Sequence, residues 1–207
     1  MARYLGPKYK ICRRIGENLW GRAKDPSAKR PYPAGEHGAA RGARRKLTNY
    51  GIHLQEKQKL RMYYGLLEKQ FRLTFKRAAR MHGVTGDNLL MMLETRLDAV
   101  CYRSGLAATV WSARQFVSHG HVLVNGKKVN IPSYQLRPGD VVTVREKSRK
   151  HPQMLEAMQQ KPSNAMPPYL SRDDNAFSVK LESKPEAADI PIPVQLDMNL
   201  IVEFYSR

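Results

Sequence analysis

The chain has 207 residues, with 36 lysines and arginines against 18 aspartates and glutamates, so its formal net charge is +18. A hydrophobic content of 42% is enough for one or two folded domains, which excludes a wholly disordered polyelectrolyte. The excess of positive charge predicts a polyanionic partner, either nucleic acid or an anionic membrane surface.

The sequence also disfavours three classes of protein: membrane proteins, secreted proteins and small proteins built around zinc or disulfides. The longest apolar run, Leu89–Leu93, has five residues, whereas a spanning helix needs about 20. The basic N-terminus has no apolar stretch behind it and does not resemble a secretory signal. Two cysteines, Cys12 and Cys101, are too few for a disulfide scaffold or a self-contained zinc site. We therefore expect a cytoplasmic protein with no membrane partner.

Residues 1–50 are predicted to form an extended basic arm. They carry 13 basic and three acidic residues, and ten of the first 46 residues are Gly or Pro. Such a segment can fold against a polyanion, and its tyrosines suit stacking on exposed bases. The alternative is a tail whose aromatic rings pack on the core. The candidate nucleic-acid contacts of the arm are Arg3, Tyr4, Lys8, Lys10, Arg13, Arg14, Arg30, Tyr32, His37, Arg44, Arg45 and Lys46.

Residues 51–96 are predicted to form a helical domain that the chain's tail completes. Within it, residues 53–82 indicate two helices separated at Gly65. In the second helix an apolar face is formed by Phe71, Phe75, Ala78, Ala79 and His82, and basic residues gather on the opposite side. That basic side either contacts phosphates or is simply solvated. The candidate contacts here are Lys57, Lys59, Arg61, Lys69, Arg72 and Lys76, with Arg80 on the same side as the last three.

One continuous helix is predicted over residues 86–104. Thr85 is a plausible N-cap, and Gly105 is a natural end. Leu89, Leu93, Leu97, Val100 and Cys101 make its apolar stripe, so we expect Cys101 to be a structural core residue.

Residues 97–150 are predicted to be a small module of helices and hairpin strands. A helix capped by Thr109 or Ser112 ends at Gly120, and strands follow at 121–124 and 127–130 around an Asn125-Gly126 turn. A turn at 137–140 precedes a further strand.

The pair His119 and His121 allows two interpretations, a metal site or a phosphate site. No Cys, Asp or Glu lies within ten residues on either side, and Gly120 favours a helix end over a strand that would align the rings. Basic and neutral donors at fixed separation suit the phosphates of folded RNA. We therefore predict RNA contacts at Arg114, Gln115, Ser118, His119, His121, Asn125, Lys127, Lys128, Lys147 and Arg149, and no metal.

Residues 151–207 carry five basic and eight acidic residues, so the tail is not expected to be the main polyanion-binding surface. It contains a short helix candidate at 153–161 and strand candidates at 177–182 and 200–206. These strands could pair with each other or with the earlier hairpin. We expect the tail to pack back on the helical domain.

Residues 97–144, "LDAVCYRSGLAATVWSARQFVSHGHVLVNGKKVNIPSYQLRPGDVVTV", resemble the S4-type RNA-binding module, which also occurs in some RNA-modifying enzymes. Four further motifs, "RPYPAGEHG", "RRKLTNYG", "QEKQKLRMYYG" and "IVEFYSR", together with "RLDAVCYR" at the start of the module, resemble the bacterial ribosomal protein S4 family over essentially the whole chain. The resemblance implies an α+β fold: a mostly helical N-terminal part with an extended arm, and a module of two helices packed on a short antiparallel sheet.

The resemblance also implies a function. Members of this family are non-catalytic binders of small-subunit ribosomal RNA that nucleate assembly of the subunit body. They contact ribosomal protein S5, influence decoding accuracy together with S12, and lie near the messenger RNA entry channel; some repress translation of their own operon. The expected protein contacts in this chain are Tyr50, Gly51, Glu203 and Tyr205. No cofactor is expected. The alternatives are an accessory of an RNA-modifying enzyme, a translational repressor, or a DNA-binding regulator.

Three parts of the chain depart from the family pattern. One branch of the family binds zinc through four N-terminal cysteines, whereas this chain keeps Cys12 and has Tyr9 where a partner would be, so we predict no zinc. Val110-Trp111 replaces basic or polar residues, which removes expected phosphate contacts and offers a stacking ring. Glu36 stands where glutamine is usual, which weakens close phosphate approach there.

Overall fold

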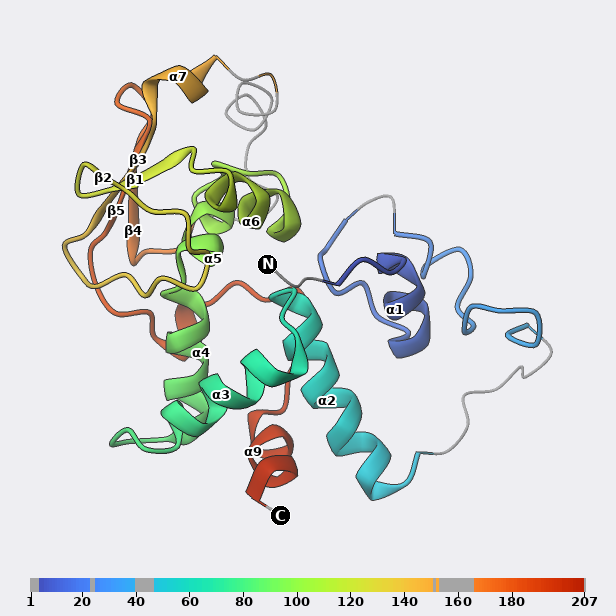
Figure 1. Cartoon of the computed structure of the whole chain (residues 1–207). Coiled ribbons are helices and arrows are strands. Elements are labelled where there is room, and N and C mark those ends of the chain that lie inside the picture. The colour runs from blue at the N-terminus through green and yellow to red at the C-terminus, as the bar shows by residue number, and fades with distance from the viewer. Residues whose placement is uncertain (1–3, 23–24, 40–46, 151, 153–165, 207) are drawn as a thin grey trace. The chain divides into compact units, whose positions relative to one another are not determined.

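The computed structural model describes residues 4–22, 25–39, 47–150, 152 and 166–206. The predicted contacts Arg3, Arg44, Arg45 and Lys46 and the helix candidate at 153–161 lie outside these residues. The chain forms two compact units, one of Met1–Leu73 with Ile192–Arg207 and one of Thr74–Pro191 (Figure 1). The four-part division into arm, helical domain, module and tail stays a prediction.

The first unit is built from helices. It contains α1 (Lys8–Ile15), α2 (Asn49–Tyr63), the start of α3 (Glu68–Ala78) and α9 (Met198–Ser206). Figure 1 shows α9 beside α2, and these two helices make extensive contact. Their core includes the fully buried side chains of Leu60, Tyr63, Phe71 and Ile201. The separation of α2 from α3 at Gly65, which has φ 62°, was predicted and is confirmed.

The strand predicted at 200–206 is wrong, because this segment is the helix α9. Asp197 Oδ1 accepts hydrogen bonds from the backbone N–H of Asn199 and Leu200, which satisfies donors that a helix start leaves free. Ile201 is then buried, and the Phe204 ring packs on Tyr50 of α2. The apolar run had suggested a strand because it lacks an obvious helical period in so short a segment.

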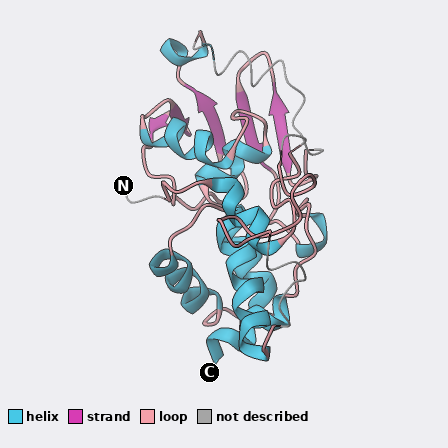
Figure 2. Cartoon of the chain, turned by 90° about the vertical axis from the view of Figure 1, so that its right-hand side faces the viewer, coloured by secondary structure: helices cyan, strands magenta, loops and turns pink. Residues whose placement is uncertain are grey.

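The second unit joins helices to one antiparallel sheet (Figure 2). Its helices are α4 (Thr85–Glu94), α5 (Leu97–Arg103), α6 (Val110–Ser118) and α7 (Glu146–Arg149), with the 3₁₀ turn η1 (Ala187–Asp189). The sheet has the order β2-β1-β3-β5-β4, with β1 at Val122–Val124, β2 at Lys127–Lys128, β3 at Val141–Val144, β4 at Leu170–Asp173 and β5 at Ser178–Leu181. The predicted α+β class is confirmed.

The register of the sheet places valines side by side on one face. Val122 pairs with Val144, and Val142 pairs with Val179 in β5. All four side chains are buried, so this face belongs to the core of the unit. Because β5 pairs with both β3 and β4, the tail's strands extend the module's sheet. Elsewhere in the tail, α9 packs on α2 and η1 contacts α4, and both of these partner helices lie within residues 51–96. The expectation that the tail as a whole packs back on the helical domain stays a prediction.

The single helix predicted over 86–104 is two helices, α4 and α5, interrupted at Thr95 and Arg96. At the break, the backbone N–H of Leu97 bonds to Tyr134 O at 2.9 Å and that of Asp98 to Pro132 O at 3.2 Å. These bonds to a distant loop replace helical ones, and a local pattern gives no sign of them. Thr85 begins α4 and Val84 is its N-cap, so the predicted cap is also wrong.

The cap at Thr109 is confirmed: its hydroxyl oxygen accepts from the Ser112 N–H at 2.9 Å. None of the helices in the described ranges combines the length and apolar character that crossing a membrane requires.

Candidate nucleic-acid interface

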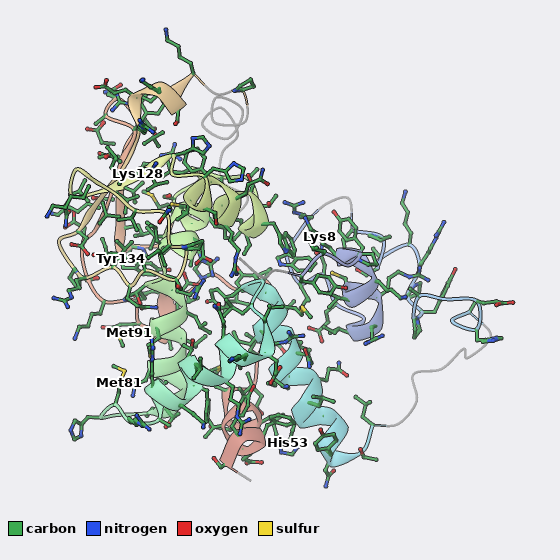
Figure 3. All side chains as sticks on the ribbon, in the orientation of Figure 1. Lys8, His53, Met81, Met91, Lys128 and Tyr134 are labelled. Atoms are coloured by element: carbon green, nitrogen blue, oxygen red, sulfur yellow. The ribbon has the colours of Figure 1, made fainter. Side chains whose placement is uncertain are left out.

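The C-terminal end of α6 and the β1–β2 hairpin form one exposed basic edge, which we call the hairpin edge: Gln115, His119, Lys127 and Lys128. Ala113 and Val117 anchor the opposite side of α6 in the core with fully buried side chains. All four residues of the edge are exposed (Figure 3 labels Lys128). The edge therefore offers ammonium, imidazole and amide groups on a scaffold that is already folded.

Gly120 ends α6 beside the Lys128 side chain. Gly120 has φ +73°, a backbone conformation that residues with a side chain rarely adopt. A Cβ atom there would also meet Lys128 Cε, but the flexible lysine could move aside. The turn that ends α6 therefore depends on this glycine.

His121 is held inside the module more than it faces solvent. Its ring stacks on Phe116 with 5.0 Å between centroids, and its Nδ1 lies 2.8 Å from Ser148 Oγ. The His119 ring is tilted against it at 6.0 Å. Within the parts of the chain that the structure describes, no group of three His, Cys, Asp or Glu residues is suited to hold a metal ion.

Asn125 and Ser118 also make internal bonds. Asn125 has φ 49° in the hairpin turn, donates from Nδ2 to Asp140 Oδ1 at 2.8 Å and accepts from the Val141 N–H at 2.9 Å. The Ser118 hydroxyl donates to Arg114 O at 2.8 Å. These side chains shape the hairpin edge, since their polar atoms already bond within the protein.

Arg114 is buried, although the sequence suggested that it would lie along the basic edge. Its side chain is 7% exposed and its Nη1 lies 4.0 Å from Asp98 Oδ2. Arg96 binds the same carboxylate through Nε at 2.9 Å and Nη2 at 2.7 Å. We therefore remove Arg114 from the proposed RNA interface and assign it to a buried charge cluster under α6.

Three basic residues of α2 are likewise engaged inside the first unit. Lys57 Nζ lies 2.8 Å from Glu68 Oε1, and Lys59 Nζ lies 2.8 Å from Glu17 and 2.7 Å from Glu56. Arg61 donates to Gln58 and to Leu66 O. Because these cations are covered and paired, we also leave them out of the proposed interface.

Helix α3 keeps its basic side open to solvent. The basic residues on this side are exposed, as the sequence pattern predicted: Lys69, Arg72 and Lys76 within α3, and Arg80 just past its end. On the opposite side Phe71, Phe75 and Ala78 are buried. The apolar face is shorter than predicted, since Ala79 and His82 are exposed.

The arm is partly helical, which sequence analysis missed because glycines and prolines surround the short α1. Cys12 and Ile15 of α1 are buried. Burial and a hydrogen bond to Asp25 raise the pKa of the Cys12 thiol to about 12, so it is inert near neutral pH.

Among the candidate contacts of the arm, one arginine is engaged within the protein and several other residues are exposed to solvent. The Arg13 guanidinium donates to Tyr32 O at 3.1 Å and Pro33 O at 3.2 Å and lies 4.9 Å from the Tyr32 ring centroid. It therefore holds the 31–38 loop on α1. Tyr4, Lys8 and Tyr32 are half-buried, whereas the remaining described candidates of the arm are exposed: Lys10, Arg14, Arg30 and His37.

The four expected protein contacts lie around the α2–α9 packing. The Tyr50 ring is exposed and lies 5.8 Å from the Phe204 centroid, with Gly51 next to it in the first turn of α2. Glu203 Oε2 lies 2.8 Å from His53 Nε2, and Figure 3 labels His53 on α2. The Tyr205 hydroxyl donates to Glu68 at 2.7 Å; burial and this hydrogen bond raise its pKa above the ordinary value.

Sequence analysis did not select several exposed cations of the second unit. Arg149 and Lys147, which it did select, flank the sheet: Lys147 is exposed, and Arg149 is half-buried and lies 5.3 Å from the Phe177 ring centroid. Arg145 and Lys150 continue the basic run around these two residues, which is a signal that was missed. The overlooked exposed cations are Arg77, Arg137, Arg145, Lys150, Lys180 and Lys184.

Comparison with known proteins gives one consistent result. Residues 3–94 match the family described as "Ribosomal protein S4/S9 N-terminal domain", and residues 95–142 match the "S4 domain". The small ribosomal subunit protein uS4 of Dinoroseobacter shibae is 49% identical over 208 residues, and the alignment covers 100% of both chains. The uS4 proteins of Ruegeria sp. and Phenylobacterium zucineum are 50% and 49% identical, again over 100% of both chains. The chain therefore belongs to the ribosomal protein S4 family.

Proposed function

We propose that this chain is a non-catalytic structural constituent of the small ribosomal subunit that binds small-subunit ribosomal RNA. The observation that carries the proposal is the full-length similarity, near 50% identity, to proteins named as small ribosomal subunit protein uS4. This similarity includes the arm and the tail as well as the RNA-binding module, whereas an enzyme that borrows the module would share that part alone.

The exposed cations support RNA as the ligand. The hairpin edge places Lys127, Lys128 and His119 on a rigid module, where they can contact phosphates at fixed separation. The exposed basic side of α3 and the exposed Lys10 and Arg14 of α1 offer further cations for phosphate contacts. Folded RNA is recognised largely through the positions of its phosphates and sugars, which suits such a surface.

We extend the proposal to the roles that the family resemblance implies. The chain would bind the RNA early, nucleate assembly of the subunit body, and contribute to decoding accuracy through a direct contact with S5 and a functional link with S12. It would act in the cytoplasm, bound to the ribosome and near the messenger RNA entry channel. None of these steps requires a cofactor or makes a covalent bond.

Filter binding of the full-length protein to small-subunit RNA tests the proposal. We expect tight binding that weakens steeply between about 50 and 200 mM salt, because each phosphate contact releases a counterion. Duplex DNA of the same length is expected to compete poorly. Equal competition by DNA, or formation of pseudouridine in the RNA by the protein alone, would contradict the proposal.

A further inference from the structure

The first unit contains a groove that the proposed RNA-binding function does not use. It is lined by Glu17 and Asn18, by Glu56 and Lys59 of α2, and by residues 193–200, and encloses about 1020 Å³. None of Tyr50, Gly51, Glu203 and Tyr205 lines this groove, although α2 and α9 contribute residues to both places. The groove is therefore distinct from the Tyr50–Glu203 surface described above.

Lys59 is the central polar group of the groove wall. Its side chain is 7% exposed, and its ammonium group lies 2.8 Å from Glu17 Oε1 and 2.7 Å from Glu56 Oε1. Burial alone lowers the pKa of this lysine, but the hydrogen bonds that it donates to Glu17 and Glu56 outweigh burial and raise the pKa, so the amine stays charged. An ammonium group has three N–H donors. Among the described residues two acceptors are provided, so one donor is left for a ligand.

The charge of the lining excludes phosphate. Glu17, Glu56 and Asp197 face a single cation, Lys59, so the groove is acidic within a chain of net charge +18. A phosphate would meet carboxylates there, whereas a cation would be attracted. The remaining wall combines apolar residues with amides: Pro193, Val194, Leu196, Met198 and Leu200, and Asn18, Gln195 and Asn199. Such a mixture suits a protein segment with apolar side chains better than a nucleic acid.

A divalent cation fits the groove less well. Calcium and magnesium require several oxygen ligands that are free to turn toward the ion. Here Lys59 engages one oxygen of each glutamate, and Glu56 Oε2 also accepts from the Asp197 N–H at 3.3 Å. Glu17, whose side chain is 34% exposed, keeps its second oxygen accessible and can accept from one further cationic group.

We propose that this groove binds a protein segment made of apolar residues around one basic side chain. The basic side chain pairs with Glu17, a backbone carbonyl of the segment accepts the third N–H of Lys59, and the apolar residues cover the 193–198 wall. This interaction goes beyond RNA binding and does not depend on it.

Anisotropy of fluorescein-labelled nonapeptides, measured with the full-length protein at about 0.15 M salt, tests the proposal. One peptide has a central arginine among leucines and valines, and its partner has glutamine in place of arginine. We expect the arginine peptide to bind about threefold to fivefold more tightly, the range of a partly exposed ion pair. Because the protein carries +18, non-specific electrostatics would give the opposite order.

Three variants locate the binding. Glu17→Gln is expected to remove the preference for arginine, while Glu186→Gln, the same charge change at an exposed position of the second unit, leaves it intact. Val194→Trp narrows the groove without a charge change and is expected to weaken the binding of both peptides. Glu17→Gln also removes one charged partner of the buried Lys59, so a modest loss of thermal stability is expected. RNA affinity should be unchanged in this variant, which separates this test from that of the RNA-binding function.

Several outcomes would overturn the proposal. The two peptides could bind equally, or Glu186→Gln could lose the preference as fully as Glu17→Gln. Displacement of the arginine peptide by single-stranded RNA, with tighter RNA binding by Glu17→Gln, would assign the groove to RNA instead.

Discussion

Lysines of helix α2 and lysines of the β1–β2 hairpin share one chemistry but are placed in opposite environments. Lys57 and Lys59 are buried, and each has a carboxylate oxygen within 2.8 Å. Lys127 and Lys128 are exposed, and the described residues place no carboxylate against them. The first pair is therefore used to hold the fold together, and the second is available for a polyanion.

The comparison shows that net charge overstates the number of cations that can bind RNA. Burying a charge is costly unless a partner and hydrogen bonds compensate for it, so each buried cation here has acidic neighbours. The same holds in the second unit, where Arg96, Arg103 and Arg114 lie inside. The chain thus divides its basic residues between internal pairs and an outer surface, and substitutions should separate the two groups.

The largest effect is expected at the buried pair of Glu94 and Arg103. Glu94 is fully buried; it accepts from Arg103 Nε and Nη2 and from the Tyr169 hydroxyl at 3.0 Å. Glu94→Gln leaves a buried guanidinium without its counterion and should lower the free energy of unfolding by about 3–5 kcal/mol. Urea denaturation measures this loss. A change below about 1 kcal/mol, the range of exposed pairs, would show that the pair is solvated in solution.

A smaller loss of stability, about 1–3 kcal/mol, is expected for Lys57→Met. Methionine keeps the apolar stem but leaves Glu68 without its shortest ion pair. Lys69→Met, on the exposed side of α3, is the matched control: it should leave stability nearly unchanged and weaken RNA binding. The opposite pattern, with RNA affinity lost at Lys57 and stability lost at Lys69, would reverse the assignment of the two lysines.

The Lys57–Glu68 pair also predicts a pH dependence. Burial alone raises the pKa of Glu68, but hydrogen bonds from Lys57 and Tyr205 outweigh it and hold the pKa below its ordinary value of 4.5. The stability from this carboxylate is therefore present above the unfolded-state pKa and is lost as the pH falls through the lower folded-state value. Lys57→Met should lose less stability than the unchanged chain when denaturation is repeated below pH 4.5.

Lys128→Ala, in the hairpin edge, is expected to weaken RNA binding about fivefold. Loss of one phosphate contact should reduce the slope of log K against log salt by about one. Arg114→Ala tests the buried group instead: it should lower stability and leave the salt slope unchanged. Filter binding over a salt series separates the two, and an unchanged slope for Lys128→Ala would remove the hairpin edge from the interface.

Elements with a local signal could be predicted from the sequence, and elements fixed by distant contacts could not. The hairpin at Asn125-Gly126, the Thr109 cap and the break at Gly65 depend on neighbouring residues and are confirmed. The break between α4 and α5 depends on hydrogen bonds to Tyr134 and Pro132, more than 30 residues away, so the helical period continued across it. The strand expected for the tail's last segment is wrong for a similar reason, because the helix there depends on packing against α2.

The candidate site shows the same limit for side chains. The alternation of basic and apolar residues correctly placed Lys69, Arg72 and Lys76 on the open side of α3. The sequence could not reveal that Arg114 faces Asp98 or that Lys59 faces Glu17, since those partners are 16 and 42 positions away. The tertiary structure determines which basic residues are exposed, whereas composition gives only the total number of basic residues.

The smallest effect is expected at Tyr205, where a single neutral donor meets the same Glu68 that Lys57 binds. Tyr205→Phe removes the 2.7 Å hydrogen bond but keeps the ring contacts with Phe71 and Phe204. The Glu68 side chain is 46% exposed, so water can replace the lost donor. We therefore expect the free energy of unfolding to fall by about 0.5 kcal/mol. RNA affinity should not change, since this hydroxyl faces the fold. A loss as large as that of Lys57→Met would mean that the tyrosine, rather than the lysine, holds α9 to the start of α3.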